Sequence, residues 1–447
     1  MPLFITLKPR IGQDKCKSVQ QTLRIRKNKC NFECISKINR NFTPILRIGK
    51  LNLITTQFMK NFKTNLLVLG SAIVAFASCT TGNSAQQTAS GLNPADFDTT
   101  INNKSVKLYT LKNANGMEAC ITNFGGRVVS LSVPDKENKL TDVVLGYDNI
   151  HQYADTVNSP SDFGSSVGRY ANRINKGKIT VAGKEYQLPQ NNFGHCLHGG
   201  PSGWQYQVYD AKQPNDTTLV LTIVSPDGDN GFPGTVTATT TYKVLSNNTL
   251  DITFEATTDK ETVVNMTNHS YFNLNGDPAN VGTDMVLYVN ADKFTPADDT
   301  YMTTGEILPV EGTPMDFRKA HAISESICDT TYEQIKNANG YDHNWCLNTY
   351  KDGNGDDTKV CASLYSPKTG IMLEMFTNEP GVQVYTGNFQ GTGIACKHGI
   401  KYPKQVSVCL ESQKYPDSPN KKDWPSPYLK PGEKYYSHVA YKFSVKK

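Results

Sequence analysis

The sequence contains few segments in which apolar residues recur every three or four positions, the spacing of an amphipathic helix. A helical bundle is therefore not expected, and residues 322–336 are the segment in which we predict one short helix. From residue 92 onward the chain also has no linker-like break, although its length alone would allow two or three domains. We accordingly treat residues 98–447 as one domain.

Paired cysteines and a zinc motif are absent as well. Seven of the 11 cysteines follow Cys79, and they are scattered with no Cys-x-x-Cys pair, so neither a zinc ribbon nor a dense disulfide scaffold is indicated. His195 and His198 are three residues apart, a spacing found in metal sites. Because no His-Glu-x-x-His motif and no carboxylate at ligand spacing accompany them, the sequence does not predict a metal.

Acidic residues are scarce in the first 78 positions, which hold 14 basic and 2 acidic side chains. The whole chain has 46 basic and 41 acidic residues and a formal net charge of +5. Without residues 1–78, 32 basic and 39 acidic side chains remain, a net charge of −7. The positive charge thus belongs to the N-terminal segment, and no nucleic-acid partner is expected.

Residues 59–78 have the pattern of a secretory signal. A short basic segment follows Met59, and residues 66–77 form an apolar run too short to span a bilayer comfortably. The run ends in Phe76-Ala77-Ser78-Cys79, which resembles the lipobox of bacterial lipoprotein signals, with Phe where Leu is usual. This resemblance implies a lipoprotein signal peptide and lipidation of Cys79; a transmembrane anchor is the alternative.

On this interpretation translation starts at Met59, and residues 1–58 are a non-native upstream extension. Residues 79–97, rich in Thr, Ser and Gln, would be a polar tether between the lipid on Cys79 and the domain. The tether lacks the acidic run that often follows the cysteine in surface-exported lipoproteins. The expected location is therefore the cell envelope, with the protein lipid-anchored to the membrane and facing the periplasm.

Most periodic segments show the period-two alternation of β-strands. Residues 235–244 and 249–256 are two such segments, and the short Ser-Asn-Asn connection between them predicts a hairpin. The other expected strands are residues 142–147, 218–224, 360–364, 371–376, 406–410 and 437–445. Many strands joined by Gly, Pro and Asn turns predict an all-β protein, either an antiparallel sandwich or a barrel.

His269 lies in the segment NHSYFNL at residues 268–274, directly after a β-branched run. A strand here would hold His269 on a rigid support, with Tyr271 and Asn273 on the same face. Histidine exchanges protons near neutral pH because its unperturbed pKa is about 6.5. The alternative is a core histidine whose nitrogens are satisfied by neighbouring side chains.

Four further segments combine polar side chains with Gly and aromatic residues. Arg173, in residues 168–174, is suited to bind hydroxyls or a carboxylate, although a surface salt bridge is the simpler explanation. The Gly pair after His198 would let that loop approach a ligand closely. Residues 340–345 place Asp342 near an indole, a combination suited to a sugar, and residues 379–387 offer the amide of Gln383.

Glu411 comes at the end of an apolar strand, in residues 408–413. Burial there would raise its pKa towards the working range of a general base. Taken singly, each of these segments is more often structural than catalytic.

Taken together and in order, these segments resemble the aldose 1-epimerase (galactose mutarotase) family. The likeness extends to residues 227–234, 304–310, 312–318 and 416–420, and it covers roughly residues 106–442. Met315, where Phe is common in the family, is one departure, and the N-terminal extension is another. The resemblance implies a large antiparallel β-sandwich and an isomerase that interconverts the anomers of free hexoses such as galactose and glucose.

The resemblance also implies roles for individual residues. Glu411 matches the family's general base and His269 its general acid, and neither a metal nor another cofactor is needed. The other matches are sugar-binding positions, His198, Asp342, Asn172, Arg173 and Gln383, and the sequence agrees at each. The oligomeric state and the preferred sugar are not implied.

Three competing functions remain open. A hexose-6-phosphate 1-epimerase would need a basic cluster at the rim of its site. A lipid-tethered carbohydrate-binding module without turnover would have little use for an intact Glu411 and His269. A glycoside hydrolase usually needs two carboxylates at a set separation, and Asp342 would be the second one in this chain.

Overall fold

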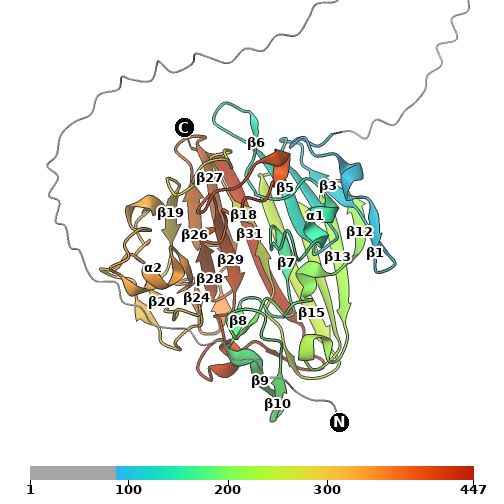
Figure 1. The fold of residues 1–447 in the computed structure, drawn as a ribbon, viewed down its shortest axis with the longest axis vertical. Helices are drawn as coiled ribbons and strands as arrows, with labels where there is room; N and C mark the ends of the chain where they lie inside the picture. Colours follow the sequence, from blue (N-terminus) through green and yellow to red (C-terminus); the bar gives the residue numbers. More distant parts are fainter. Residues whose placement is uncertain (1–86, 447) are drawn as a thin grey trace, which may run out of the picture. The chain divides into compact units, whose positions relative to one another are not determined.

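The computed structural model describes residues 87–446, and nearly all of its regular structure is β-strand (Figure 1). The largest sheet has nine strands, in the spatial order β12-β13-β14-β15-β31-β27-β26-β19-β22. Their bounds, in that order, are Asp210–Asn215, Thr218–Ser225, Val236–Val244, Thr249–Thr258, Tyr435–Val445, Ile371–Thr377, Ala362–Tyr365, Val286–Val289 and His321–Ala322.

Two smaller sheets accompany it. A six-stranded sheet contains β18 (Tyr271–Phe272), β29 (Val408–Gln413), β28 (Gly381–Tyr385), β23 (Asp342–Cys346), β20 (Lys293–Thr295) and β21 (Leu308–Pro309) in that spatial order. A four-stranded sheet contains β3 (Leu108–Lys112), β4 (Glu118–Thr122), β5 (Arg127–Pro134) and β6 (Leu140–Asp142).

Six two-stranded pairs complete the strands. They are β1 (Thr99–Ile101) with β2 (Lys104–Val106), β7 (Ser165–Val167) with β17 (Thr267–His269), β8 (Arg173–Ile174) with β11 (Cys196–Leu197), β9 (Lys178–Val181) with β10 (Lys184–Gln187), β16 (Thr262–Val263) with β30 (Tyr428–Leu429), and β24 (Tyr350–Lys351) with β25 (Asn354–Gly355).

Helices are few and short in residues 87–446. The α-helices are α1 (Ile150–Ala154) and α2 (Glu333–Ala338), and α2 lies beside β20 in Figure 1. The 3₁₀ turns are η1 (Pro94–Phe97), η2 (Asn175–Gly177), η3 (Trp204–Tyr206), η4 (Asp229–Gly231), η5 (Ile323–Glu325), η6 (Lys397–Gly399) and η7 (Ser418–Asn420). The one helix expected in residues 322–336 is therefore split into η5 and the later α2.

The period-two pattern of apolar and polar residues from which the strands were predicted matches the pattern of buried and more exposed side chains in the structure. Along β14 and β15 every second side chain is buried, and the two strands pair antiparallel as the predicted hairpin. Every pairing between strands in residues 87–446 is antiparallel, and one isolated parallel bridge joins Tyr170 and Asn265. The all-β prediction is confirmed.

Residues 142–147 differ from the prediction, because β6 ends at Asp142. The backbone after it bonds to the segment that follows His269: Leu145 donates its N–H to Tyr271 O, and Val143 O accepts from Asn273 N–H. An apolar run alone does not distinguish such a buried connection from a strand.

The main hydrophobic core lies between the nine-stranded sheet and the two smaller sheets. It combines side chains of β14, β15 and β31 with side chains of β4, β28 and β29. Tyr441 of β31 joins the layers, because its ring lies 5.0 Å from that of Phe272 and its hydroxyl donates to Leu410 O at 2.7 Å. The arrangement is a β-sandwich, as the resemblance implied.

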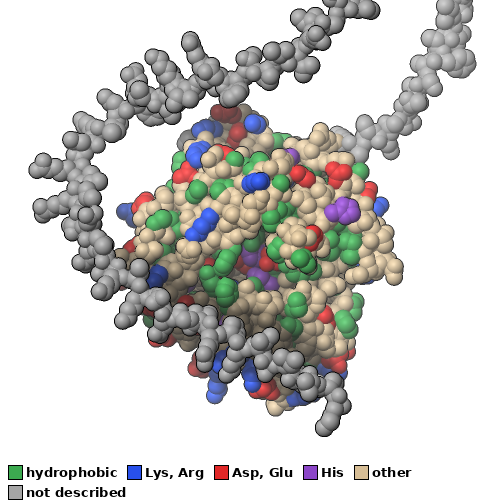
Figure 2. Space-filling view, in the orientation of Figure 1, with side chains coloured by type: hydrophobic (Ala, Val, Ile, Leu, Met, Phe, Trp, Pro, Cys, Tyr) green, Lys and Arg blue, Asp and Glu red, His purple; other side chains and the backbone are tan. Residues whose placement is uncertain are grey.

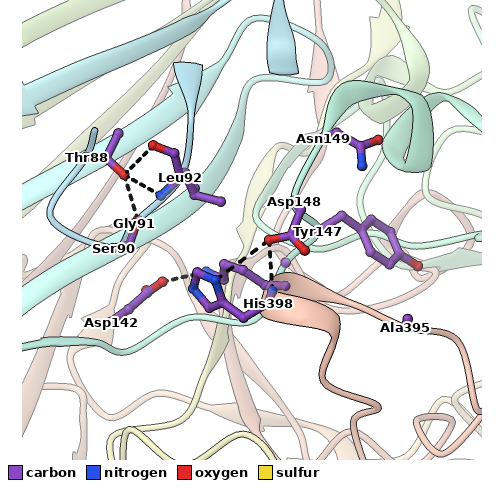
Figure 3. A network of polar contacts seen from close by, with 12 residues as sticks. Thr88, Ser90, Gly91, Leu92, Asp142, Tyr147, Asp148, Asn149, Ala395 and His398 are labelled. Atoms are coloured by element: carbon purple, nitrogen blue, oxygen red, sulfur yellow. Dashed lines mark hydrogen bonds and ion pairs between the residues drawn. The ribbon is translucent and has the colours of Figure 1, made fainter. Parts of the chain in front are cut away.

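The packed part of the chain begins before residue 98. The hydroxyl of Thr88 bonds to the backbone of Leu92, and the side chains of Leu92 and Phe97 are buried (Figure 3). The expected tether, residues 79–97, thus has its last part packed on the domain. Figure 3 also shows His398 against Asp148, whose carboxylate accepts the backbone N–H of residue 398 at 2.8 Å.

Several predictions fall on residues that the structure does not describe. The upstream extension (residues 1–58), the signal peptide (residues 59–78) and the lipidation site Cys79 all lie outside residues 87–446. Within residues 87–446, no helix combines the length and the apolar character needed to cross a membrane.

Trp345 of β23 lies in the main core, on the apolar face of the six-stranded sheet. Its ring is fully buried against Phe294 and Phe317, and its Nε1 donates to Met315 O at 3.0 Å. We expect Trp345→Ala to lower the free energy of unfolding by about 3–5 kcal/mol, since it leaves a cavity and an unpaired carbonyl. Urea denaturation measures this.

Tyr436→Ala is the matched control, because Tyr436 is an exposed aromatic residue on β31. Its substitution is expected to change the free energy of unfolding by no more than about 0.5 kcal/mol. Equal effects of the two substitutions would contradict this account of the core.

Candidate active site

The six-stranded sheet has an apolar face and a polar face, because successive side chains of a strand point to opposite sides. On β29, Val408 and Leu410 belong to the main core. Glu411 lies between Leu410 and Ser412 and therefore points the other way, where it is 2% exposed. The apolar strand thus places a carboxylate on the face away from the core; Glu411 lies within β29 and not at its end.

The neighbouring strands extend this polar face. Gln383 of β28 pairs directly with Glu411 and, on its other side, with Asn344 of β23. Asp342 lies diagonally across from Gln383, which donates its Nε2–H to Asp342 Oδ1 at 2.7 Å. Gln413 Nε2 donates in turn to Gln383 Oε1 at 3.2 Å. The amide of Gln383 is therefore oriented on both sides.

His269 reaches the carboxylate from a different pair of strands. It ends β17, which pairs with β7, and its Nε2 lies 3.5 Å from Glu411 Oε1. Its ring stacks on that of Tyr271 at a centroid distance of 4.9 Å. The predicted continuous strand is interrupted at Ser270, and Asn273 donates to Val406 O instead of joining the site.

Arg173 begins β8, Asn172 directly precedes it, and His198 directly follows β11. His198 has a left-handed backbone (φ +51°), and its Nδ1 accepts the N–H of Asn172 at 3.1 Å. In the neutral ring the proton is therefore on Nε2. The guanidinium of Arg173 is held by Asn192 Oδ1, which accepts from Nε at 3.1 Å and from Nη2 at 3.0 Å.

These side chains surround one cavity of about 380 Å³. Six of the seven predicted site residues line it, Glu411, His269, His198, Asp342, Asn172 and Arg173. Gln383 does not line it and acts on it through Asp342. In Figure 2, histidine and acidic side chains are visible near the middle of this face, with apolar side chains around them.

Burial moves the two central groups towards their neutral forms. It raises the pKa of Glu411 well above the ordinary value of a carboxyl group, and the negative charge of Asp342 raises it further. Burial, with a smaller contribution from His198, lowers the pKa of His269 to about 3. Glu411 Oε2 and His269 Nδ1 have no hydrogen-bond partner although both are buried. Such orphaned atoms indicate a site built for a polar ligand.

The other cavity residues are shifted in the same way. Burial raises the pKa of Asp342 against the opposing effect of Arg173, and it lowers the pKa of His198 to about 3. Burial also lowers the pKa of Arg173, while Asp342 raises it. Arg173 remains a cation at neutral pH, because an arginine is not deprotonated in proteins.

One set of residues meets the distance requirement for a metal ion within residues 87–446: one ligand atom each of His198, His269 and Glu411 lies within 4.8 Å of the others. His195, the other histidine of the i, i+3 pair, is occupied elsewhere. Its Nδ1 accepts the N–H of Lys176 at 3.1 Å, and its Nε2 lies 3.0 Å from Thr300 Oγ1. The close histidines of the sequence therefore do not form a site together.

Sequence reasoning missed several residues of the cavity. Asp162 is a further carboxylate in its lining, and its charge raises the pKa of Glu411. Tyr206, Asn192 and Phe389 also line the cavity. None of these residues belongs to a recognisable motif. Asn192 lies shortly before His195 and His198 in the sequence, and Phe389 lies shortly after residues 379–387. This proximity was the only signal in the sequence.

A β-sandwich that holds a buried carboxylate against an imidazole, among hydroxyl-binding side chains, defines an acid–base enzyme for a small polar substrate. The family model described as aldose 1-epimerase matches residues 107–442. Galactose mutarotase of Mus musculus is 40% identical over 325 residues, 73% of this chain and 90% of that protein. Aldose 1-epimerase of Escherichia coli K12 is 36% identical over 340 residues, 75% and 95% of the two chains.

Solved structures similar to this chain support the same family assignment. An aldose epimerase homologue from C. elegans superposes with a TM-score of 0.70 at 30% identity, covering 76% of this chain and 100% of that one. Galactose 1-epimerase from Lactobacillus acidophilus gives a TM-score of 0.67 at 28% identity, with 78% and 97% covered. The chain belongs to the aldose 1-epimerase family, and it is accordingly an isomerase with mutarotase activity on aldoses.

Proposed function

We propose that this protein interconverts the α and β anomers of free hexoses such as galactose and glucose, with Glu411 as general base and His269 as general acid. The observation that carries the proposal is the pair itself: Nε2 of His269 lies 3.5 Å from Oε1 of Glu411, at the wall of a cavity, and both groups are buried. A cyclic hemiacetal needs proton transfer at two neighbouring oxygens, O1 and O5, to open.

The opening step starts from the form of the pair in which its one proton has moved from Glu411 to Nε2 of His269. The Glu411 carboxylate then removes the proton from the anomeric hydroxyl, and the His269 imidazolium protonates the ring oxygen. The C1–O5 bond breaks, its electron pair goes to O5, and C1 becomes an aldehyde. Rotation about C1–C2 presents the other face of the carbonyl. The reverse transfers then close the ring as the opposite anomer, so the pair regains its starting protonation. This acid–base route requires no metal or redox cofactor.

The remaining side chains position the sugar. Asp342 accepts from Gln383 and has a second oxygen for a sugar hydroxyl, while Arg173 supplies donors in a fixed fork. His198 presents Nε2–H to the cavity because its Nδ1 is occupied by Asn172. These contacts restrict the sugar to orientations in which O1 and O5 meet the pair.

The activity is expected to survive in acid far below the pKa of an ordinary histidine. The pair works while it holds one proton. Because the pKa of His269 is lowered to about 3, the pair binds a second proton only near that pH. Because the pKa of Glu411 is raised, the pair loses its one proton only at a higher pH than an ordinary carboxyl group does. We expect kcat/KM to be retained as the pH is lowered to about pH 4, and to fall on the alkaline side.

The measurement is kcat/KM against pH, with the buffer-catalysed rate subtracted at each point. A half-maximal loss of kcat/KM at about pH 5 or above as the pH is lowered would show that a second proton binds the pair well above the pKa of about 3 of His269. That result would contradict the protonation states assigned to the pair.

A phosphorylated substrate is less compatible with this cavity. Among the described residues that line it, Arg173 is the only Lys or Arg, and it faces three carboxylates, Glu411, Asp342 and Asp162. The cavity therefore offers a phosphate dianion one cation among three acidic side chains. Exchange between anomeric protons, followed by NMR on glucose and on glucose 6-phosphate, separates the substrates; faster exchange with the phosphate alone would overturn the proposal.

A binding module and a glycoside hydrolase are tested by the same exchange measurement and one additional assay. A binding module without turnover would bind hexoses and leave their exchange rate at that of buffer. A glycoside hydrolase would release the chromophore from aryl glycosides, using Asp342 or Asp162 as the second carboxylate with Glu411. We expect neither result.

We also propose that the mature protein begins at a lipidated Cys79 and is held at the cell envelope, facing the periplasm. The apolar run and lipobox-like end of residues 59–79 support this proposal. The expected result of mass spectrometry on protein from its native membrane is an acylated N-terminal peptide starting at Cys79. Detection of peptides from residues 1–58, or an unmodified Cys79, would contradict the anchor.

A further inference from the structure

Two residues of the cavity wall, Asp162 and Tyr206, have no part in the proton transfer or in the sugar contacts described above. Both side chains line the cavity. Oδ1 of Asp162 is buried and has no hydrogen-bond partner among the described residues. Because buried acceptors are nearly always paired, this oxygen is expected to receive a donor from a molecule bound in the cavity.

A single guanidinium fixes the two residues relative to each other. Arg127, which is fully buried on β5, donates from Nη1 to Phe163 O at 3.1 Å and from Nη2 to Gln205 O at 2.8 Å. Phe163 directly follows Asp162, and Gln205 directly precedes Tyr206. The same guanidinium lies 5.7 Å from the ring centroid of Tyr206. Arg127 thus joins the two segments that carry the cavity residues.

The segment that carries Asp162 is also bonded to the strand of the general acid. The N–H and the hydroxyl of Ser165 donate to Asp162 O at 3.1 and 2.9 Å, and Gly164 N–H donates to His269 O at 2.9 Å. The position of Asp162 relative to His269 is therefore set by backbone contacts.

Asp162 and Tyr206 offer complementary hydrogen-bonding groups. The negative charge of Asp162 is the main cause that raises the pKa of Tyr206 above the ordinary value of a phenol, and burial raises it further. The two side chains are therefore close together, and the phenol keeps its proton. A carboxylate only accepts, whereas a phenol also donates. A sugar hydroxyl, which is both a donor and an acceptor, matches this combination.

We propose that Asp162 and Tyr206 are specificity-determining residues that together bind one hydroxyl of the hexose other than the anomeric one. Oδ1 of Asp162 accepts the proton of this hydroxyl, and the phenol of Tyr206 donates to its oxygen. The inference rests on the proposed function, in which Glu411 and His269 hold O1 and O5 and leave the hydroxyls on C2, C3, C4 and C6 to the rest of the wall. Arg127 is a positioning residue behind the two side chains. A sugar that lacks the bound hydroxyl leaves a buried carboxylate oxygen unpaired and is therefore disfavoured.

The test combines variants of the protein with deoxy sugars. Mutarotation of D-galactose and of its 2-, 3-, 4- and 6-deoxy derivatives is measured for the wild type and for Asp162→Ala. We expect Asp162→Ala to lower kcat/KM for galactose by about 10- to 100-fold, the range for a hydrogen bond to a charged group. The wild type should lose a similar factor on one deoxy derivative, and on that derivative Asp162→Ala should differ from the wild type by no more than about twofold.

The other three deoxy derivatives are expected to lose the same factor as galactose in Asp162→Ala. Tyr206→Phe should show the same selectivity with a smaller loss on galactose, about 3- to 10-fold, because its hydroxyl is neutral. Asp162→Asn, which keeps an acceptor oxygen, should recover part of the activity. Asp216→Ala and Tyr436→Phe are the matched controls, since both residues are exposed and outside the cavity, and they should change the rate for none of the sugars.

An equal loss on galactose and on all four deoxy derivatives in Asp162→Ala would show a general disturbance of the site and would overturn the proposed contact, as would the absence of any loss. If Asp162→Ala does not fold, the same comparison with Tyr206→Phe decides. A wild type that accelerates mutarotation of none of the sugars would contradict the proposed function. Calorimetry with the same sugars would then decide the contact from the dissociation constants, and no binding of galactose would overturn it.

Discussion

Replacing Glu411 by Gln is expected to lower kcat for mutarotation by about 10²–10⁴-fold. Glutamine has nearly the shape of glutamate, but its amide cannot take the proton of the anomeric hydroxyl. Glu411 is 2% exposed and faces His269 at 3.5 Å, so water has little access to replace it. The measurement is the initial rate of optical rotation on freshly dissolved α-D-galactose, with the buffer rate subtracted.

The control for Glu411→Gln is Glu374→Gln. Glu374 is a half-buried carboxylate on β27 whose side chain lies 4.0 Å from the ammonium of Lys442, outside the cavity. This variant should keep the wild-type rate. Glu411→Gln should still fold and bind galactose, as judged by circular dichroism and calorimetry. A folded, sugar-binding Glu411→Gln with nearly wild-type kcat would show that this carboxylate is not the base.

His269→Asn is expected to lower kcat by a similar factor, about 10²–10⁴-fold. Asparagine can donate a hydrogen bond to the ring oxygen but cannot transfer a proton to it, so the C1–O5 bond opens to an unprotonated alkoxide. His151→Asn, at an exposed position on α1, is the matched control. The same optical-rotation assay measures both.

The double variant Glu411→Gln/His269→Asn distinguishes a cooperating pair from two separate effects. If the two groups act on one transition state, the double variant loses little more than the more impaired single variant, because either loss alone abolishes the concerted path. Losses that multiply would show two independent contributions and would contradict a concerted opening of the ring.

The sheets were predictable where one face of a strand is buried and the other is not. Residues 235–244 and 249–256 alternate because every second side chain enters the core, and β14 and β15 follow those ranges closely. Residues 142–147 are mostly apolar for another reason, because most of them form a buried connection. The spacing of apolar residues alone does not distinguish such a connection from a buried strand.

The membership of the site was predictable only through the family resemblance. Glu411, Gln383 and Asn344 lie in one row because three strands distant in sequence pair in a particular register, and no local pattern encodes that register. Asp162 is a single carboxylate in a loop and belongs to no motif, although it lines the same cavity. The break in the strand at Ser270, which turns Asn273 away from the cavity, depends likewise on tertiary hydrogen bonds.

The most direct test of the proposed chemistry is polarimetry on freshly dissolved α-D-glucose and α-D-galactose, using protein that starts at residue 80. The account predicts a faster approach to the same final rotation as in buffer, and the loss of this acceleration in both Glu411→Gln and His269→Asn. A wild-type rate equal to that of buffer on both sugars would contradict the central claim that the Glu411–His269 pair opens and closes the ring of free hexoses.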